Sequence, residues 1–237
     1  MPKNDEDRVV VIDVDGKPKK ISKREVAKEN EKLEQAIKEK KTKLKTRKKQ
    51  KTEESKMPVM LVEQQDRSIN IGVVGVGQCG SKLAEEFYNR GYNTVVINTA
   101  LQDLKPIKIP EGQKLFLDYS LGGAAKDLDT GQAAVETYSG AVVKHLKDNF
   151  EDCEILLLAT SGGGGTGSGS AEVMVELMAG LDKPISVLYV LPLGSEDTLA
   201  KHNAIQTLAK LAKLAKSDVI NSLIVIDNAK IELMFPG

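Results

Sequence analysis

The chain has 237 residues, of which 41 % are hydrophobic and 29 % are charged, and its formal net charge at pH 7 is zero. This composition is that of an ordinary soluble chain. No apolar run approaches the roughly 18 residues that a membrane span requires. The N-terminus is charged throughout, unlike a secretory signal, and two cysteines, Cys79 and Cys153, do not make a disulfide framework. We therefore expect a cytoplasmic protein with reduced thiols and no membrane span.

Residues 1–66 are predicted to form a charged N-terminal extension. Residues 17–51 hold 16 Lys or Arg against 5 Asp or Glu, a net charge of +11, whereas residues 67–237 hold 15 against 20, a net charge of −5. Residues 8–14 are predicted to form a strand. The stretch after Ser22 lacks Gly and Pro, which favours a helix. Two interpretations of this basic helix remain open, a solvated helix and one that binds nucleic acid or another acidic partner.

Residues 67–237 alternate apolar strands with helices, and we expect them to form one domain. This alternation is typical of an α/β fold with three layers, in which a mostly parallel sheet carries helices on both faces. In such sheets ligands bind beyond the carboxyl ends of the strands. The predicted strands are 69–76, 93–97, 113–117, 154–160, 185–191 and 222–226. The predicted helices are 80–90, 131–149, 170–181 and 198–216.

A first glycine-rich turn, Gly75-Val76-Gly77-Gln78-Cys79-Gly80, follows the first of these strands. Its G-x-G-x-x-G spacing between a strand and a helix indicates at first a dinucleotide site. Such a site needs an acidic residue at the end of the next strand to bind ribose hydroxyls. The next strand ends in Asn98-Thr99-Ala100, and no carboxylate follows until Asp103. The missing carboxylate argues against an NAD-dependent oxidoreductase, which remains an alternative.

A second glycine run covers residues 162–169 and contains six glycines, with Thr166 and Ser168 as its other members. It lies between an apolar strand and a helical segment, where backbone N–H groups and a helix N-terminus can surround phosphates. A flexible linker is the alternative for such a run. The run is not a Walker loop, because no lysine follows until Lys183. Phosphate charge would therefore be met by amides, hydroxyls and a metal ion.

Together these two loops resemble those of the tubulin/FtsZ family of GTP-binding filament proteins. The segment Gly77-Gln78-Cys79-Gly80 has the form of the first phosphate loop of tubulins, and residues 164–169 look like the tubulin signature loop. Residues 98–104 are similar to the second loop of bacterial FtsZ. They depart from it at Ala100, where FtsZ usually has aspartate.

Three later segments resemble further parts of the family's nucleotide site. Residues 121–125 look like the third loop, which wraps the terminal phosphate in the family. Residues 192–203 lie where the loop that contacts ribose is expected, and Ile226-Asp227-Asn228 resembles the strand end that offers an asparagine to guanine. The resemblance implies GTP or GDP as the ligand, together with Mg²⁺. The site residues that it implies are Gly77, Gln78, Cys79, Gly80, Asn98, Gly122, Gly123, Ala124, Gly163, Gly164, Gly165, Thr166, Gly167, Ser168, Glu196 and Asn228.

The resemblance also implies which part of the ligand each of these residues would contact. Backbone amides of the two glycine loops would hold the phosphates, assisted by the hydroxyls of Thr166 and Ser168. The third loop would meet the terminal phosphate. Glu196, four residues after a proline, would contact the ribose, and the amide of Asn228 can both donate to and accept from guanine. No catalytic residue and no metal ligand are assigned.

Hydrolysis and assembly are expected to depend on more than these residues. In the family, acidic residues in the second domain of one subunit meet the GTP of the next subunit. The sequence ends at Gly237, before the position expected for that domain, so we expect GTP binding here and hydrolysis once a catalytic loop is supplied. Self-association into filaments is expected of full-length members. A non-catalytic module whose basic helix binds DNA or a partner remains an alternative, and comparing the binding of GTP, ATP and NAD separates the three interpretations.

Overall fold

The structure is a computed structural model that describes residues 8–12, 18–22 and 68–235. The chain divides into two compact units, Met1–Leu61 and Val62–Gly237.

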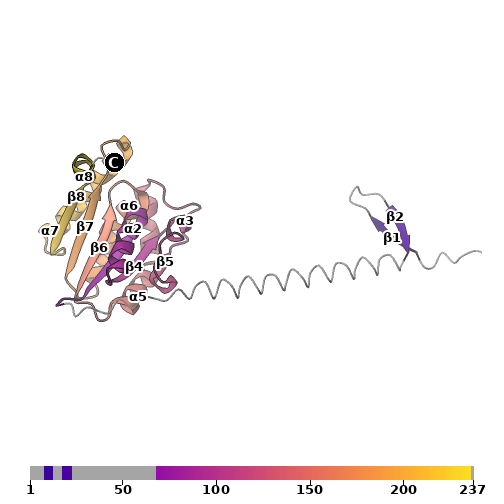
Figure 1. Cartoon of the computed structure of the whole chain (residues 1–237), viewed down its shortest axis with the longest axis horizontal. Helices are drawn as coiled ribbons and strands as arrows, with labels where there is room; N and C mark the ends of the chain where they lie inside the picture. Colours follow the sequence, from indigo (N-terminus) through magenta and orange to yellow (C-terminus); the bar gives the residue numbers. More distant parts are fainter. Residues whose placement is uncertain (1–7, 13–17, 23–67, 236–237) are drawn as a thin grey trace, which may run out of the picture. The chain divides into compact units, whose positions relative to one another are not determined.

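In the first unit, β1 (Arg8–Ile12) and β2 (Pro18–Ser22) pair as antiparallel strands, with Arg8 opposite Ser22 (Figure 1). The strand expected at residues 8–14 is observed over its described part. The second strand was missed by the sequence analysis. The predicted basic helix lies outside the described residues.

The second unit is built on a six-stranded sheet in which every neighbouring pair is parallel. The strand order is β5-β4-β3-β6-β7-β8, so the strands that precede the two glycine loops, β3 and β6, lie side by side. The strands are β3 (Ile71–Val76), β4 (Asn93–Asn98), β5 (Lys114–Phe116), β6 (Ile155–Ser161), β7 (Ile185–Leu191) and β8 (Ser222–Asp227). All six predicted strands are confirmed to within two residues at either end.

The helices differ from the prediction mainly where they begin. Helix α2 begins three residues earlier than predicted and α6 five residues earlier, so both start inside glycine motifs, although glycine is a poor helix former. The single helix expected at 131–149 is two helices, α4 and α5, and the short helices α3 and α8 were not predicted. The helices are α2 (Gly77–Asn89), α3 (Leu101–Leu104), α4 (Leu128–Thr137), α5 (Ser139–Phe150), α6 (Gly165–Ala179), α7 (Thr198–Lys216) and α8 (Asn228–Met234), with a 3-10 turn at Glu111–Gln113.

Helices cover both faces of the sheet, as the α/β prediction requires (Figure 1). Successive strand residues point to opposite faces. Val74 therefore packs in the core formed with α4, α5, α6 and α7, which also buries Phe150 and Met174. Its neighbour Val73 packs in the smaller core on the other face, with Ala84 of α2. Burial on both faces explains why these strands are almost continuously apolar.

Helices α4 and α6 cross at very close range because glycines occupy the crossing. A Cβ atom on Gly131 would lie 2.2 Å from the carbonyl oxygen of Gly165, and one on Gly169 would lie 2.1 Å from that of Leu128. Both distances are far shorter than van der Waals contact, so any side chain would push the helices apart. The crossing holds the loop that precedes α4 against the N-terminus of α6.

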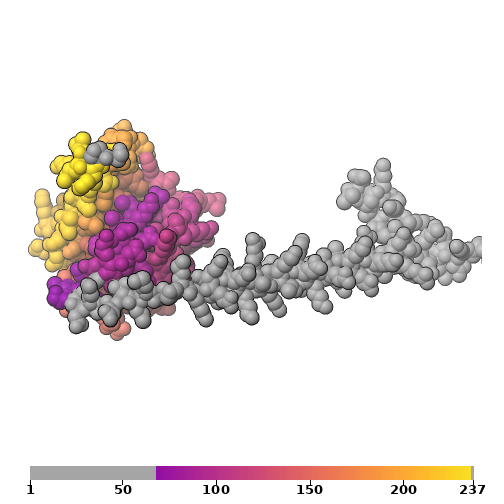
Figure 2. All heavy atoms as spheres, in the orientation of Figure 1, coloured from indigo at the N-terminus to yellow at the C-terminus, as the bar shows by residue number. Residues whose placement is uncertain are grey.

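The last strand and helix leave apolar side chains at the surface. Ile224 and Val225 on β8, and Ile231, Leu233 and Met234 on α8, are between 44 and 82 % exposed. Figure 2 shows this C-terminal part of the unit, in yellow, on the outside of the molecule. Among the helices that the structure describes, none is both long and apolar enough to cross a bilayer.

Candidate functional site

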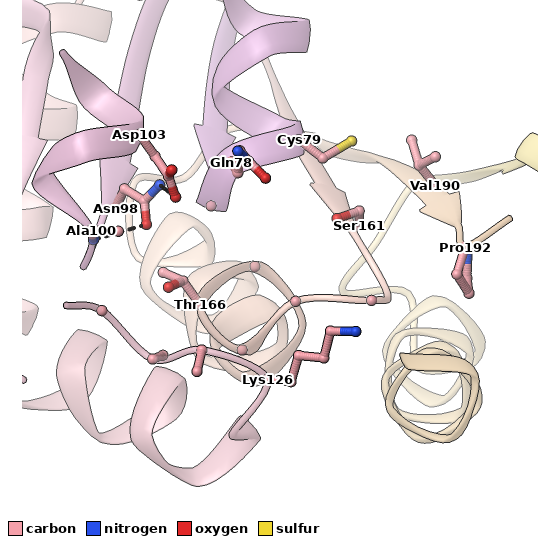
Figure 3. Close-up of a pocket in the computed structure, with 18 of the residues that line it drawn as sticks. Gln78, Cys79, Asn98, Ala100, Asp103, Lys126, Ser161, Thr166, Val190 and Pro192 are labelled. Atoms are coloured by element: carbon pink, nitrogen blue, oxygen red, sulfur yellow. Dashed lines mark hydrogen bonds between the residues drawn. The ribbon is translucent and has the colours of Figure 1, made fainter. Parts of the chain in front are cut away.

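A cavity of about 450 Å³ opens at the carboxyl ends of β3, β4, β6, β7 and β8 (Figure 3). These are five consecutive strands of the sheet. Because neighbouring strands lie about 4.8 Å apart, the cavity extends over roughly 19 Å and suits an elongated ligand. Its lining residues are Gly77, Gln78, Cys79, Asn98, Ala100, Gln102, Asp103, Gly122, Gly123, Ala124, Ala125, Lys126, Ser161, Gly163, Gly164, Gly165, Thr166, Gly167, Val190, Leu191, Pro192, Glu196 and Asn228.

Fourteen of the sixteen predicted site residues line this cavity, and two do not. Gly80 lies against β6 instead, where a Cβ atom would approach the carbonyl oxygen of Ala159 to 2.2 Å. The hydroxyl of Ser168 is buried and donates to the carbonyl oxygen of Ser161 at 2.8 Å. Both residues therefore hold helices against β6 rather than facing the cavity.

Two helices reach the cavity with N-termini that no side chain caps. The N-cap residues Val76 of α2 and Gly164 of α6 accept no hydrogen bond through a side chain, and neither first turn contains an acidic residue. Helices α4 and α7, in contrast, are capped by the carboxylates of Asp127 and Asp197. A helix N-terminus has unsatisfied N–H groups and a positive partial charge. The ends of α2 and α6 therefore offer donors and positive potential to an anion.

The first turn of α6 does not present all of its amides to the cavity. The N–H of Gly165 donates to the carbonyl oxygen of Ala125 at 2.8 Å. A Cβ atom on Gly165 would lie 2.6 Å from the carbonyl oxygen of Ala124. Gly165 therefore fastens the loop before α4 to α6, and its amide is not available to a phosphate. The amides of Thr166 and Gly167 belong to the part of the turn that has no intrahelical acceptor.

The two glycine loops meet at Gly77. Its φ of +74° lies in the left-handed region, which glycine adopts without strain. A Cβ atom here would lie 2.9 Å from the backbone nitrogen of Gly167. Glycine at this position lets the N-termini of α2 and α6 approach each other, so their amides form one set of donors.

Buried hydroxyls join three of the loops around this set of donors. The Oγ1 atoms of Thr99 and Thr166 lie 2.6 Å apart, and the N–H of Ala124 donates to Thr99 Oγ1 at 3.1 Å. Because Thr99 accepts from Ala124, its own proton can go to Thr166. The proton of Thr166, which lines the cavity, is then left for a ligand.

Asn98 shapes the loop after β4. Its side chain is 1 % exposed, and its Oδ1 accepts from the N–H of Ala100 at 3.2 Å. Its Nδ2 donates to the carboxylate of Asp103 at 3.4 Å, as Figure 3 shows. The bonds of Asn98 are thus internal to the protein, and they hold the Asp103 carboxylate at the cavity.

Glu196 and Asn228 lie towards the other end of the cavity, where β7 and β8 end. Glu196 Oε1 accepts from the N–H of Leu193 at 2.9 Å, and its Oε2 would lie 2.9 Å from a Cβ atom on Gly163. Asn228 is half-buried at the start of α8, which Asp227 caps. The amide of Asn228 forms no hydrogen bond with the other described residues, so both its donor and its acceptor are available.

Several residues that line the cavity were not predicted from the sequence. Two of them, Lys126 and Asp103, carry a charge. Among the described residues that line the cavity, Lys126 is the one Lys or Arg, and Asp103 and Glu196 are the acids. Lys126 directly follows the predicted third loop. Its position beside a predicted phosphate loop is the sequence signal by which it could have been predicted. Its Nζ lies 2.5 Å from the carboxylate of Asp197, and this hydrogen bond lowers the pKa of Asp197.

The other ionisable group at the cavity is a thiol. Burial raises the pKa of Cys79, so its thiol is neutral at pH 7 and does not repel an anion. Within the described ranges, no group of three His, Cys, Asp or Glu side chains is placed to hold a metal ion.

Comparisons with known proteins agree with this geometry. Residues 70–235 match the model of the Tubulin/FtsZ family, GTPase domain. The chain is 32 % identical over 168 residues to the tubulin-like protein CetZ of Pyrococcus abyssi, covering 68 % of this chain and 45 % of that protein. It is 27 % identical over 180 residues to the tubulin-like protein TubZ of Bacillus cereus, covering 71 % and 41 %.

Solved structures with the same fold include a GTPγS-bound protofilament of CetZ2 from Haloferax volcanii. It superposes with a TM-score of 0.60 at 27 % identity, covering 68 % of this chain and 49 % of that one. An empty FtsZ dimer from M. jannaschii superposes with a TM-score of 0.61 at 26 % identity, covering 73 % and 49 %. The chain thus spans less than half the length of the relatives named here. The family match runs from β3 to α8 and includes every strand end that borders the cavity, and on this evidence the chain belongs to the Tubulin/FtsZ family.

Proposed function

We propose that this chain binds GTP and GDP in the cavity, with the phosphates at the N-termini of α2 and α6 and the guanine at Asn228. The observation that carries the proposal is the meeting of two uncapped helix N-termini at Gly77 and Gly167. Unsatisfied amides and aligned helix dipoles favour a multiply charged anion at this point. The length of the cavity leaves room for a nucleoside beyond the phosphates.

The phosphate end of the site would use backbone donors. These are the amides of Gly77, Gln78 and Cys79 on α2, and those of Thr166 and Gly167 on α6, with the Thr166 hydroxyl beside them. In the third loop, Gly122 would offer its N–H to the terminal phosphate, because the N–H groups of Gly123 and Ala124 already donate to the carbonyl oxygen of Ser120 and to Thr99 Oγ1. Gly122 and Gly123 have φ values of +82° and +93°, a conformation that glycine adopts readily and that turns backbone groups in directions unusual for other residues.

Asn228 would recognise the base, and Glu196 the ribose. A side-chain amide offers one acceptor and two donors, which matches the guanine edge, where N–H donors lie beside a carbonyl acceptor. Adenine presents its donor and acceptors at other positions, so an amide held in the orientation that fits guanine loses a hydrogen bond to adenine. Oε1 of the Glu196 carboxylate accepts from the N–H of Leu193. The other oxygen, Oε2, is left to accept from a ribose hydroxyl.

Mg²⁺ fits the phosphate end of the cavity. This ion is typically held by one or two carboxylates together with phosphate oxygens, and Asp103 supplies a carboxylate that lines the cavity. When bound, the ion neutralises charge on the phosphates. GTP hydrolysis and filament assembly are proposals for the whole protein. The match to a GTPase domain supports hydrolysis, and the protofilament state of the similar CetZ2 supports assembly.

The basic segment at residues 17–51 favours a second activity, binding to nucleic acid. Its net charge of +11 would attract the phosphate backbone and release counterions. Fluorescence anisotropy with labelled DNA should show binding that weakens steeply as salt is raised. Binding that does not change with salt would contradict an electrostatic interaction.

Isothermal titration calorimetry with GTP, GDP, ATP and NAD tests the main proposal. With Mg²⁺ present, GTP and GDP should bind and ATP and NAD should bind at least tenfold more weakly, since losing one hydrogen-bonded group at a specific site costs about 1.4 kcal/mol or more. Equal affinities for GTP and ATP would exclude a guanine site at Asn228. Tight NAD binding would favour a dinucleotide enzyme instead.

A further inference from the structure

Lys126 has an anchored backbone and a movable amino group. Its carbonyl oxygen accepts from Nδ2 of Asn203 at 2.8 Å, and Asn203 on α7 is only 3 % exposed. The side chain of Lys126 is 41 % exposed, and the four-carbon stem of a lysine is flexible. Figure 3 shows this side chain extended beside the glycine-rich loop at the start of α6. The amino group can therefore change partners while the loop stays in place.

Its present partner, Asp197, does not need this ion pair to stay in position. One oxygen, Oδ1, accepts from the N–H of Ala200 at 2.8 Å and caps α7, and the other oxygen forms the pair with Lys126. Asp197 is 57 % exposed. Exposed ion pairs contribute little net stability, so the amino group can leave Asp197 at small cost while the cap remains.

A bound nucleotide would attract the same amino group more strongly than Asp197 does. A phosphate chain carries several negative charges, and a lysine ammonium forms short, charge-assisted hydrogen bonds with phosphate oxygens. Of the described residues around the cavity, no other Lys or Arg could supply this charge.

We propose that Lys126 releases Asp197 and binds a phosphate oxygen when a nucleotide enters, so that Asp197 competes with the nucleotide for the amino group. The inference rests on the proposed function and extends it. It adds a cation supplied by the chain, and it adds an internal carboxylate that weakens nucleotide binding.

A double-mutant cycle in GTP affinity tests the exchange. Lys126→Met removes the cation, with Lys126→Gln as a second replacement. Asp197→Asn removes the competing charge but keeps a cap, since asparagine is as good an N-cap as aspartate. Lys210→Met is the matched control, because Lys210 forms a similarly exposed pair with Glu172 at 3.0 Å and does not line the cavity.

Lys126→Met should weaken GTP binding about tenfold or more, the usual loss for a hydrogen bond to a charged group. Asp197→Asn should tighten binding about threefold in the wild-type background, as expected for one exposed ion pair, and much less in the Lys126→Met background. Lys210→Met should bind GTP like the wild type. Titrations at about 0.15 M salt limit direct repulsion from Asp197, and circular dichroism confirms that each variant is folded.

Three results would count against the exchange, each in a distinguishable way. Wild-type affinity in folded Lys126→Met and Lys126→Gln variants would overturn the phosphate contact. An equal effect of Asp197→Asn in both backgrounds would mean simple repulsion and would overturn the competition. If the wild-type chain binds no GTP, the proposed function itself fails, and the inference fails with it.

Discussion

Gly164→Val is the substitution that best separates nucleotide binding from folding. Gly164 has a φ of −95° and a ψ of 170°, which other residues adopt without strain, and no atom lies within 4 Å of the position of a Cβ. Replacing an N-cap glycine costs roughly 0.5–1 kcal/mol, and the stiffer unfolded chain offsets a similar amount. We therefore expect the free energy of unfolding to change by less than about 1 kcal/mol.

The effect on binding should be much larger. Gly164 lines the cavity at the N-terminus of α6, so a valine side chain would enter the space that we assign to phosphate oxygens. A hydrogen bond to a charged group contributes about 1.5–3 kcal/mol. Losing one such bond weakens GTP binding by about 10- to 100-fold. Gly165→Val is not informative in the same way, because its Cβ would lie 2.6 Å from the carbonyl oxygen of Ala124 and would disturb the fold.

Calorimetric titration with GTP and Mg²⁺, together with urea denaturation, measures both quantities on the same samples. Gly112→Val is the control, because a Cβ at Gly112 also meets no atom within 4 Å and Gly112 does not line the cavity. The control should keep the wild-type affinity. A folded Gly164→Val variant with wild-type GTP affinity would refute the placement of phosphates at the N-terminus of α6.

Three further predictions concern the core, the base and acid stability. Phe150→Ala should lower the free energy of unfolding by about 3–5 kcal/mol in urea denaturation, because this ring is 1 % exposed; a loss below about 1 kcal/mol would contradict its place in the core. Asn228→Ala should weaken GTP binding about tenfold while leaving weak ATP binding unchanged in calorimetry, and an equal loss for both would argue against base recognition. The hydrogen bond from the Thr130 hydroxyl lowers the pKa of Asp127. Stability from this carboxylate is therefore fully present above the ordinary aspartate pKa of about 3.9 and is lost as the pH falls through the lowered pKa of the folded state. Urea midpoints measured against pH should show a shallower decline over that acid range for Asp127→Asn, and an unchanged decline would contradict this role.

The strands could be predicted from the sequence because their signal is local. Each of the six predicted strands is observed, since near-continuous apolar runs such as Ile185–Leu191 are explained by burial on both faces of a parallel sheet. The polar and glycine-rich ends of β3, β4 and β6 were also visible as breaks in those runs. Parallel strands end at one edge of the sheet, so the sequence alone placed most of the candidate site at that edge.

The helix starts could not be predicted in the same way. Glycine propensity argues against a helix at Gly77 and Gly165, yet both residues begin one. At Gly77 the left-handed φ and the nearby backbone of Gly167 require glycine. At Gly165 the close loop before α4 requires glycine. A carbonyl oxygen of that loop also accepts from the Gly165 N–H, which the sequence had led us to assign to phosphate. Contacts between segments far apart in the sequence therefore fix where both helices begin, and no local sequence pattern indicates such contacts.

What the sequence by itself determined is the set of strands, the motifs that follow them and, through these, the family. Only the tertiary structure decided how the motifs meet. The order of the sheet sets β3 beside β6. The glycine crossing of α4 and α6 brings in the third loop, and the hydrogen bond from the buried Asn203 fixes Lys126 at the rim of the cavity. The physical reason is that apolar periodicity depends on neighbours in the chain, whereas contacts between backbones depend on segments that are far apart in sequence and approach only when the core is packed.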